Sequence, residues 1–154
     1  MSLIDDFRKL RSRPLAECGL VVEACMFLCL MRIAVLLVPF QRIVGFLGLN
    51  QDESAALPSP QQTKISKSIG WAVQAAGTRI SWASPCLSQA LAGMVMLRRR
   101  GIPGVLYLGV ARDLSMSEPL SAHAWLMCGD AFLTGGSGHE RFSVLSKFVG
   151  KNGL

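Results

Sequence analysis

The sequence has few charged and few aromatic residues for its length. Only 17% of its 154 residues are charged, whereas 51% are hydrophobic. A chain this apolar does not stay disordered in water, and its length suits one domain with a buried core. The seven Phe, three Trp and one Tyr are not interleaved with basic residues. RNA and single-stranded DNA are therefore not expected as partners, and we predict no nucleic-acid binding.

A long uninterrupted hydrophobic run is also missing. The apolar segment 15–38 contains Glu17, Glu23 and Arg32, and its longest charge-free run, 33–41, has nine residues. A membrane-spanning helix needs about 18 or more apolar residues with few charges. The region 14–49 is therefore expected to be a buried or amphipathic helical region with a break near Pro39. Peripheral membrane contact stays open, because basic residues flank this region.

The cysteines do not form the pattern of a disulfide-stapled protein. There are five, an odd number, and three of them lie in one apolar segment; they are Cys18, Cys25, Cys29, Cys86 and Cys128. Secreted scaffolds usually have even numbers of cysteines spread over loops, and no signal-peptide pattern is visible at the N-terminus. We therefore expect free thiols and a cytoplasmic location. No clustered set of metal ligands is present, so neither a metal nor a cofactor is expected.

Helical patterns come first in the chain and strand patterns follow, which predicts an α+β fold. We expect an N-terminal helical region and linker over 1–62 and a catalytic core over 63–154. The last stretch, 142–149, fits no pattern clearly. The expected elements of the core are a helix over 63–82, a helix opened by Ser84-Pro85-Cys86, strands over 105–110, 121–128 and 131–134, and a tight turn at Gly129-Asp130.

Cys86 stands where a helix begins, and this position can activate a thiol. Helix N-termini favour the thiolate, but the dipole is worth only about 0.3–1 kcal/mol at an exposed site, so a second group is needed. His123, in the sequence AHAW on an expected strand, is the candidate base. The free backbone N–H groups of Cys86 and Leu87 could hold an oxyanion. By residue type alone, a buried inert thiol and a structural histidine are the commoner outcome.

The remaining candidates have weaker support. Cys128 is at a hairpin end without an activating neighbour, and His139 follows a glycine run where it can simply be solvated. Cationic residues gather at 8–13 and 98–100; they could bind an acidic peptide or anionic lipid, or lie at solvated helix ends.

Several segments together resemble one known family. Residues 85–91 (PCLSQAL), 97–103 (LRRRGIP), 108–110 (LGV) and 122–125 (AHAW) occur in the order found in the lasso-peptide maturation proteases, and 36–40 (LLVPF) is similar to their N-terminal region. The resemblance covers nearly the whole chain. It implies a papain-like or transglutaminase-like cysteine peptidase core with Cys86 as nucleophile and His123 as base.

The resemblance also implies a reaction and partners. Such proteins remove the leader peptide from a ribosomally made lasso precursor. A separate leader-recognition protein and an ATP-dependent cyclase similar to asparagine synthetase work with them. This chain resembles the stand-alone protease form.

One position departs from the family pattern. The acidic residue expected about a dozen positions after the histidine is replaced here by Gly135. A regular hairpin would pair His123 with Gly136 and place Thr134 diagonally on the same face. Thr134, or Asp130 at the turn, is therefore a candidate third member of the site.

Two other functions stay open at this point. The same Cys–His site could transfer an acyl group to an amine instead of to water. A non-enzymatic protein that binds a membrane surface through residues 14–49, or serves as a scaffold, is the second alternative.

Overall fold

The computed structural model describes residues 15–51, 54–80, 82, 85–112, 114–115, 117 and 120–150. Within them, four α-helices and one five-stranded antiparallel sheet form an α+β fold, as the order of sequence patterns predicted. The helices are α2 (Leu15–Leu37), α3 (Phe40–Phe46), α4 (Pro60–Arg79) and α5 (Cys86–Arg98). The strands are β1 (Leu49–Asn50), β2 (Val105–Arg112), β3 (Leu120–Cys128), β4 (Ala131–Thr134) and β5 (Ser143–Gly150), and a short 3-10 turn, η2, covers His139–Arg141.

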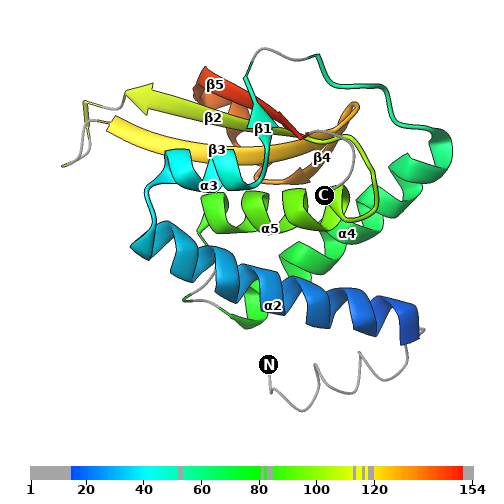
Figure 1. Cartoon of the computed structure of the whole chain (residues 1–154). Helices are drawn as coiled ribbons and strands as arrows, with labels where there is room; N and C mark the ends of the chain where they lie inside the picture. The colour runs from blue at the N-terminus through cyan, green and yellow to red at the C-terminus, as the bar shows by residue number, and fades with distance from the viewer. Residues whose placement is uncertain are drawn as a thin grey trace.

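The elements are stacked in layers, with the sheet on one side and α2 farthest from it (Figure 1). Helices α4 and α5 contact the sheet, and α2 packs on α4 and α5. Leu28, Leu91 and Leu126, from three different layers, are fully buried in the same apolar core. Burial of side chains of this size stabilises a fold by about 1.5–3 kcal/mol each, so the layers are held together mainly by apolar contact.

The sheet has the order β1-β5-β2-β3-β4, so the last strand in sequence lies inside it. The sequence left 142–149 unassigned, and the structure shows that Ser143–Gly150 pairs with β2 and, at its end, with β1. Val144 and Leu145 in this strand are exposed, which hides the apolar alternation that would have revealed it. Pairing with distant strands decides the structure of this segment.

Helix α4 begins three residues earlier than the sequence predicted. We expected a linker up to residue 62 and a helix over 63–82, but the helix starts at Pro60. Ser59 caps it: its hydroxyl accepts from the Gln62 N–H at 3.2 Å, and the Gln62 side chain accepts from the Ser59 N–H at 2.9 Å. This is a capping box with proline at the first helical position, where the missing N–H costs nothing.

Helix α2 ends at Leu37, and Pro39 precedes α3, which agrees with the break expected near Pro39. Val21, Ala24 and Leu28 form its buried face. By length and composition alone α2 could cross a membrane. Its buried face packs on α4 and α5, however, so these contacts fit a helix that lies along the domain.

The β3–β4 hairpin has the expected two-residue turn, but its register differs from the prediction. Cys128 pairs with Ala131, and Gly129 has φ +56°, the conformation that favours glycine in tight turns. A bulge then shifts the pairing so that Leu126 lies opposite Thr134. One extra residue in a strand moves all later side chains to the other face. The expectation that Thr134 shares a face with His123 is therefore wrong.

Candidate active site

Cys86 is the first residue of α5, as the sequence predicted. Pro85 occupies the N-cap position and provides no side-chain hydrogen bond, while the expected cap, Ser84, lies outside the described residues. The first backbone bond of the helix runs from Gln89 N–H to the Pro85 carbonyl at 3.1 Å. The N–H groups before Gln89 belong to the first turn, where intrahelical acceptors are missing. They can therefore bind a negatively charged oxygen beside the thiol.

His123 lies on β3, on the face of the sheet that α5 does not cover. Its neighbours Ala124 and Leu126 point into the core, whereas His123 stacks on Trp125 with ring centroids 5.9 Å apart. The Phe142 ring also lies against the imidazole, at 4.9 Å between centroids. The imidazole thus contacts two aromatic side chains and is half-buried.

The imidazole has one hydrogen bond in the structure. His123 Nε2 lies 2.7 Å from the carbonyl oxygen of Gly135. Nδ1 has no hydrogen-bond partner among the residues that the structure describes. One edge of the ring is thus anchored to the backbone, and Nδ1 is left available for a proton.

Contacts between α5 and the sheet place Cys86 and His123 at about the same position along the direction of β3. Gly93 lies against Leu126, since a Cβ on Gly93 would be 2.6 Å from Leu126 Cδ2. Cys86 is seven residues before Gly93, about 10 Å along a helix, and about 10 Å along a strand is three residues. Counting back from Leu126 therefore gives His123, because α5 runs in the same direction as β3 (Figure 1).

The structure does not bring the two side chains together. Cys86 packs against the core on the α5 side of the sheet, whereas the imidazole lies on the other face. No hydrogen bond joins Cys86 and His123 in the described part of the chain, so their pairing stays a prediction. On the open side, β4 ends at Thr134 and pairs only as far as Leu126. The stretch of β3 that carries His123 is therefore not covered by a further strand there.

The two candidates for a third member lie away from the imidazole. Thr134 is 1% exposed and faces α5, where its hydroxyl has no hydrogen-bond partner within the described residues. Asp130 is exposed at the turn beyond Cys128, at the opposite end of β3 from His123. The hydrogen bond that we expected from a side chain comes instead from the backbone of Gly135.

Two of the other thiols, Cys25 and Cys128, lie in surroundings that disfavour a thiolate. Burial raises the pKa of Cys25, and the neighbouring Cys29 raises it further. Burial also raises the pKa of Cys128, at the far end of β3 from His123. No group of three or more metal-ligating side chains occurs among the described residues. A metal centre has no support in this part of the chain.

His139 is the second histidine on the same side of the sheet. Its Nδ1 lies 2.6 Å from the Gly136 carbonyl oxygen, and its ring contacts Phe132 and Trp125. Trp125 therefore contacts both imidazoles. From its place after a glycine run we expected His139 to be solvated, whereas the structure packs it against aromatic side chains.

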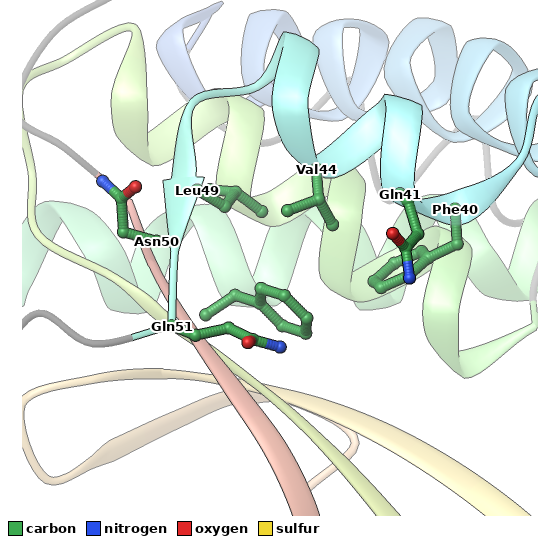
Figure 2. Close-up of a pocket in the computed structure, with 7 residues that line it drawn as sticks. Phe40, Gln41, Val44, Leu49, Asn50 and Gln51 are labelled. Carbon is green, nitrogen blue, oxygen red and sulfur yellow. The ribbon is translucent and has the colours of Figure 1, made fainter.

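A hollow of about 360 Å³ lies at the opposite edge of the sheet from β4 (Figure 2). Phe40, Val44, Leu49 and Phe148 form its apolar wall, and Gln41, Asn50 and Gln51 provide amide groups. Strands β5 and β2 separate β1 from β3. This hollow is therefore not the cleft of the Cys86–His123 site.

Comparison with known proteins gives the family. The family model described as "Transglutaminase-like superfamily" matches residues 27–147, most of the chain. The chain belongs to the transglutaminase-like superfamily. No curated protein and no solved structure matches it significantly.

Membership of the transglutaminase-like superfamily supports a cysteine-dependent enzyme. The superfamily includes cysteine peptidases and acyltransferases, and its members commonly depend on a cysteine. The matched segment contains both Cys86 and His123. It also begins inside α2 and so crosses the boundary predicted at residue 62, which stays a prediction.

Proposed function

We propose that this transglutaminase-like protein is a cysteine protease that removes the leader peptide from a lasso-peptide precursor. The observation that carries the proposal is the position of Cys86 at the start of α5, in a transglutaminase-like domain that also contains His123 on β3. The reaction requires the imidazole to reach the α5 side of the sheet. The order of the segments around both residues, which resembles the lasso-peptide maturation proteases, supports this substrate.

The reaction uses a thiol, an imidazole and a helix N-terminus. His123 takes the proton of Cys86, and the thiolate attacks the scissile carbonyl of the precursor. The first-turn N–H groups of Cys86 and Leu87 stabilise the oxyanion. The carbon–nitrogen bond then breaks, His123 gives its proton to the leaving amine, and a thioester remains. Water, deprotonated by His123, hydrolyses the thioester and restores the thiol.

The proposed partners follow from this role. A separate leader-recognition protein presents the leader, and a cyclase similar to asparagine synthetase closes the macrolactam after cleavage. The site itself requires no cofactor, because thiol and imidazole supply both nucleophile and base. We propose a cytoplasmic location for this assembly.

The test compares alanine substitutions of two cysteines, Cys86 in the proposed site and Cys128 outside it. Cys86→Ala should abolish release of the core peptide, because the acyl-enzyme cannot form. Cys128→Ala changes a buried thiol at the other end of β3 and should preserve cleavage. Mass spectrometry of a precursor incubated with the recognition protein measures both. Cleavage by the Cys86→Ala protein at the wild-type rate would show that the proposal is wrong.

Acyl transfer is the alternative reaction for the same site. A transferase would pass the acyl group from Cys86 to an amine, which leaves a product with added mass. A protease leaves two fragments whose masses sum to the precursor plus one water. The same mass spectrum therefore separates the two reactions.

A second candidate function concerns the outer face of α2. Val22, Met26, Leu30 and Ile33 recur at helical spacing and are about half exposed or more. They continue into a groove of about 540 Å³ between α2 and α3, which Arg42 also lines. Exposed apolar surfaces of this extent mark interaction sites. Because the basic segment 8–13 precedes α2, we propose an anionic membrane surface as the partner.

Vesicle sedimentation tests this second function. The protein should sediment with phosphatidylcholine vesicles that contain phosphatidylglycerol, and much less with phosphatidylcholine alone. Leu30→Asp should reduce sedimentation, whereas Leu145→Asp, at an exposed apolar position on β5, should not. Cys86→Ala should sediment like the wild type. Equal sedimentation of the Leu30→Asp and wild-type proteins would contradict membrane binding through α2.

A further inference from the structure

The hollow at the β1 edge of the sheet has an uncharged lining within the described part of the chain. Its side chains are apolar or carry amides: Phe40, Gln41, Val44, Leu49, Asn50, Gln51 and Phe148. An ion that entered this space would lose water without meeting an opposite charge, which is unfavourable. The hollow is therefore suited to a neutral ligand.

The apolar wall of the hollow is built around two aromatic rings. Phe40 of α3 and Phe148 of β5 lie edge to face, with their centroids 5.5 Å apart. Phe148 belongs to the buried core, so packing of the domain fixes this wall. Aromatic rings bind a further aromatic or aliphatic side chain by offset or edge-on contact. The volume of about 360 Å³ fits one large side chain with the peptide groups next to it.

Two amides face the same space from different elements. Gln41 of α3 and Gln51, which follows β1, extend into the space beside the Phe40 ring, whereas Asn50 points away from it (Figure 2). Neither glutamine side chain has a hydrogen-bond partner within the described residues. An amide both donates and accepts hydrogen bonds, as a peptide group does. The two glutamines can therefore bind the backbone on either side of an apolar side chain.

The main chain is also open at this edge. Strand β1 is the end strand of the sheet, and β5 is its one partner among the described strands. An extended peptide can add to such an edge through main-chain hydrogen bonds, while alternate side chains enter neighbouring pockets. Leu49 is part of β1 and also lines the hollow. A peptide that lies along β1 would therefore place a side chain at the hollow.

We propose that the hollow is a second binding site for the leader of the precursor peptide, and that an apolar side chain of the leader enters it. This inference rests on the proposed function for the identity of the peptide. Strands β5 and β2 lie between β1 and β3, so the β1 edge is about 14 Å from β3, which α5 contacts. A residue of extended chain covers about 3.3 Å, so the bound side chain is at least about four residues from the bond that Cys86 attacks.

A peptide titration tests the chemistry of the hollow. The probes are seven-residue peptides of glycine and serine with a central phenylalanine, alanine or aspartate. Nitrogen-15 NMR should show shifts of the Gln41 and Gln51 side-chain amides with the phenylalanine peptide. This peptide should bind at least about tenfold more tightly than the alanine peptide, because it buries an aromatic ring, and the aspartate peptide should bind no better than the alanine peptide. Equal binding of all three peptides would overturn the proposal.

Glutamine-to-glutamate variants locate the binding site. Gln41 and Gln51 are exposed, so Gln41→Glu and Gln51→Glu should fold like the wild type. Each variant loses an amide donor and adds a charge to the hollow, which should weaken binding of the phenylalanine peptide about three- to tenfold. Gln61→Glu, at an exposed position in the first turn of α4, is the matched control and should bind like the wild type. Wild-type affinity in both hollow variants would overturn the proposal.

Cleavage kinetics connects the hollow with the proposed function. With a lasso precursor and the recognition protein, Gln41→Glu and Gln51→Glu should raise KM about three- to tenfold and leave kcat unchanged, because the lost contacts are away from the reacting bond. Gln61→Glu should change neither constant. Wild-type KM in both hollow variants would refute binding of the leader there.

The two proposals can fail separately. Binding of the phenylalanine peptide at the hollow, without cleavage of any lasso precursor, would refute the protease proposal and leave the peptide site in place. Cleavage of a precursor by a protein whose hollow binds none of the peptides would refute this inference and leave the protease proposal in place.

Discussion

The two halves of β3 show how one strand can serve both the core and the site. Leu126 and Met127 have β2 on one side and β4 on the other, and Leu126 lies against α5. The half that begins at Leu120 pairs with β2 alone, and its first three residues are exposed. His123 is in this second half, where one backbone carbonyl anchors its ring. A well-packed half thus positions a half that stays accessible to a substrate.

The largest difference that we expect between the two halves of β3 is in their contribution to the free energy of unfolding. Leu126→Ala removes a fully buried side chain, so it should lower the free energy of unfolding by about 2–5 kcal/mol. Leu120→Ala, on the same strand with 66% exposure, should change it by less than about 0.5 kcal/mol. Urea denaturation of both variants measures the difference. Equal losses would show that the two halves are packed alike.

A smaller effect is expected from Thr134, which faces α5 rather than His123. Its buried hydroxyl lacks a partner within the described residues, so Thr134→Val should keep or raise stability, by up to about 1 kcal/mol. Cleavage of the precursor should stay at the wild-type rate. Thermal unfolding and the cleavage assay on the same sample measure both. A large loss of activity with unchanged stability would restore Thr134 as the third member of the site.

The smallest effect on stability is expected at the C-terminal end of α5, away from Cys86. Arg99 and Arg100, just beyond that end, bind Glu23 of α2 at 2.6 and 2.7 Å. The hydrogen bond from Arg100 is the main cause of a lowered Glu23 pKa, below its ordinary 4.5. Because both arginines are partly exposed, Glu23→Gln should cost only about 0.5–1 kcal/mol at neutral pH.

The pH dependence of this loss has a defined sign. The folded state holds the carboxylate more strongly than the unfolded chain does, so its contribution is complete above pH 4.5. The contribution disappears as the pH falls through the lowered folded-state pKa. Urea denaturation of the wild type and Glu23→Gln from neutral to acidic pH should therefore converge in acid. A difference that persists in acid would mean that packing, not charge, ties α2 to α5.

Local signals in the sequence located most elements. Pro39 separates α2 from α3, Gly129-Asp130 forms the hairpin turn, and Cys86 begins a helix. These features depend on the residues themselves, because proline and glycine restrict or widen the local backbone. We missed the cap at Ser59 because proline is common both in linkers and at the first position of a helix. We assigned Pro60 to a linker, whereas it is the first residue of α4.

Features that depend on distant contacts could not be predicted in this way. The bulge beside Leu126 moves Thr134 to the helix side of the sheet, and no residue there signals it. The strand Ser143–Gly150 forms because β2 and β1 offer it partners. For the site, the sequence led to Cys86, His123 and a gap at Gly135, but not to the group that contacts the imidazole.

The sequence by itself therefore determined the α+β order, the helix start at Cys86 and the absence of an acidic residue at Gly135. The first two follow from residue types and their spacing, and the third has meaning only through the resemblance to the lasso-peptide maturation proteases. Only the tertiary structure decided that the Gly135 carbonyl meets His123 Nε2 and that α5 lies level with this part of β3. The physical reason is that a backbone carbonyl is present at every position, so its role depends on the fold and not on the residue that carries it.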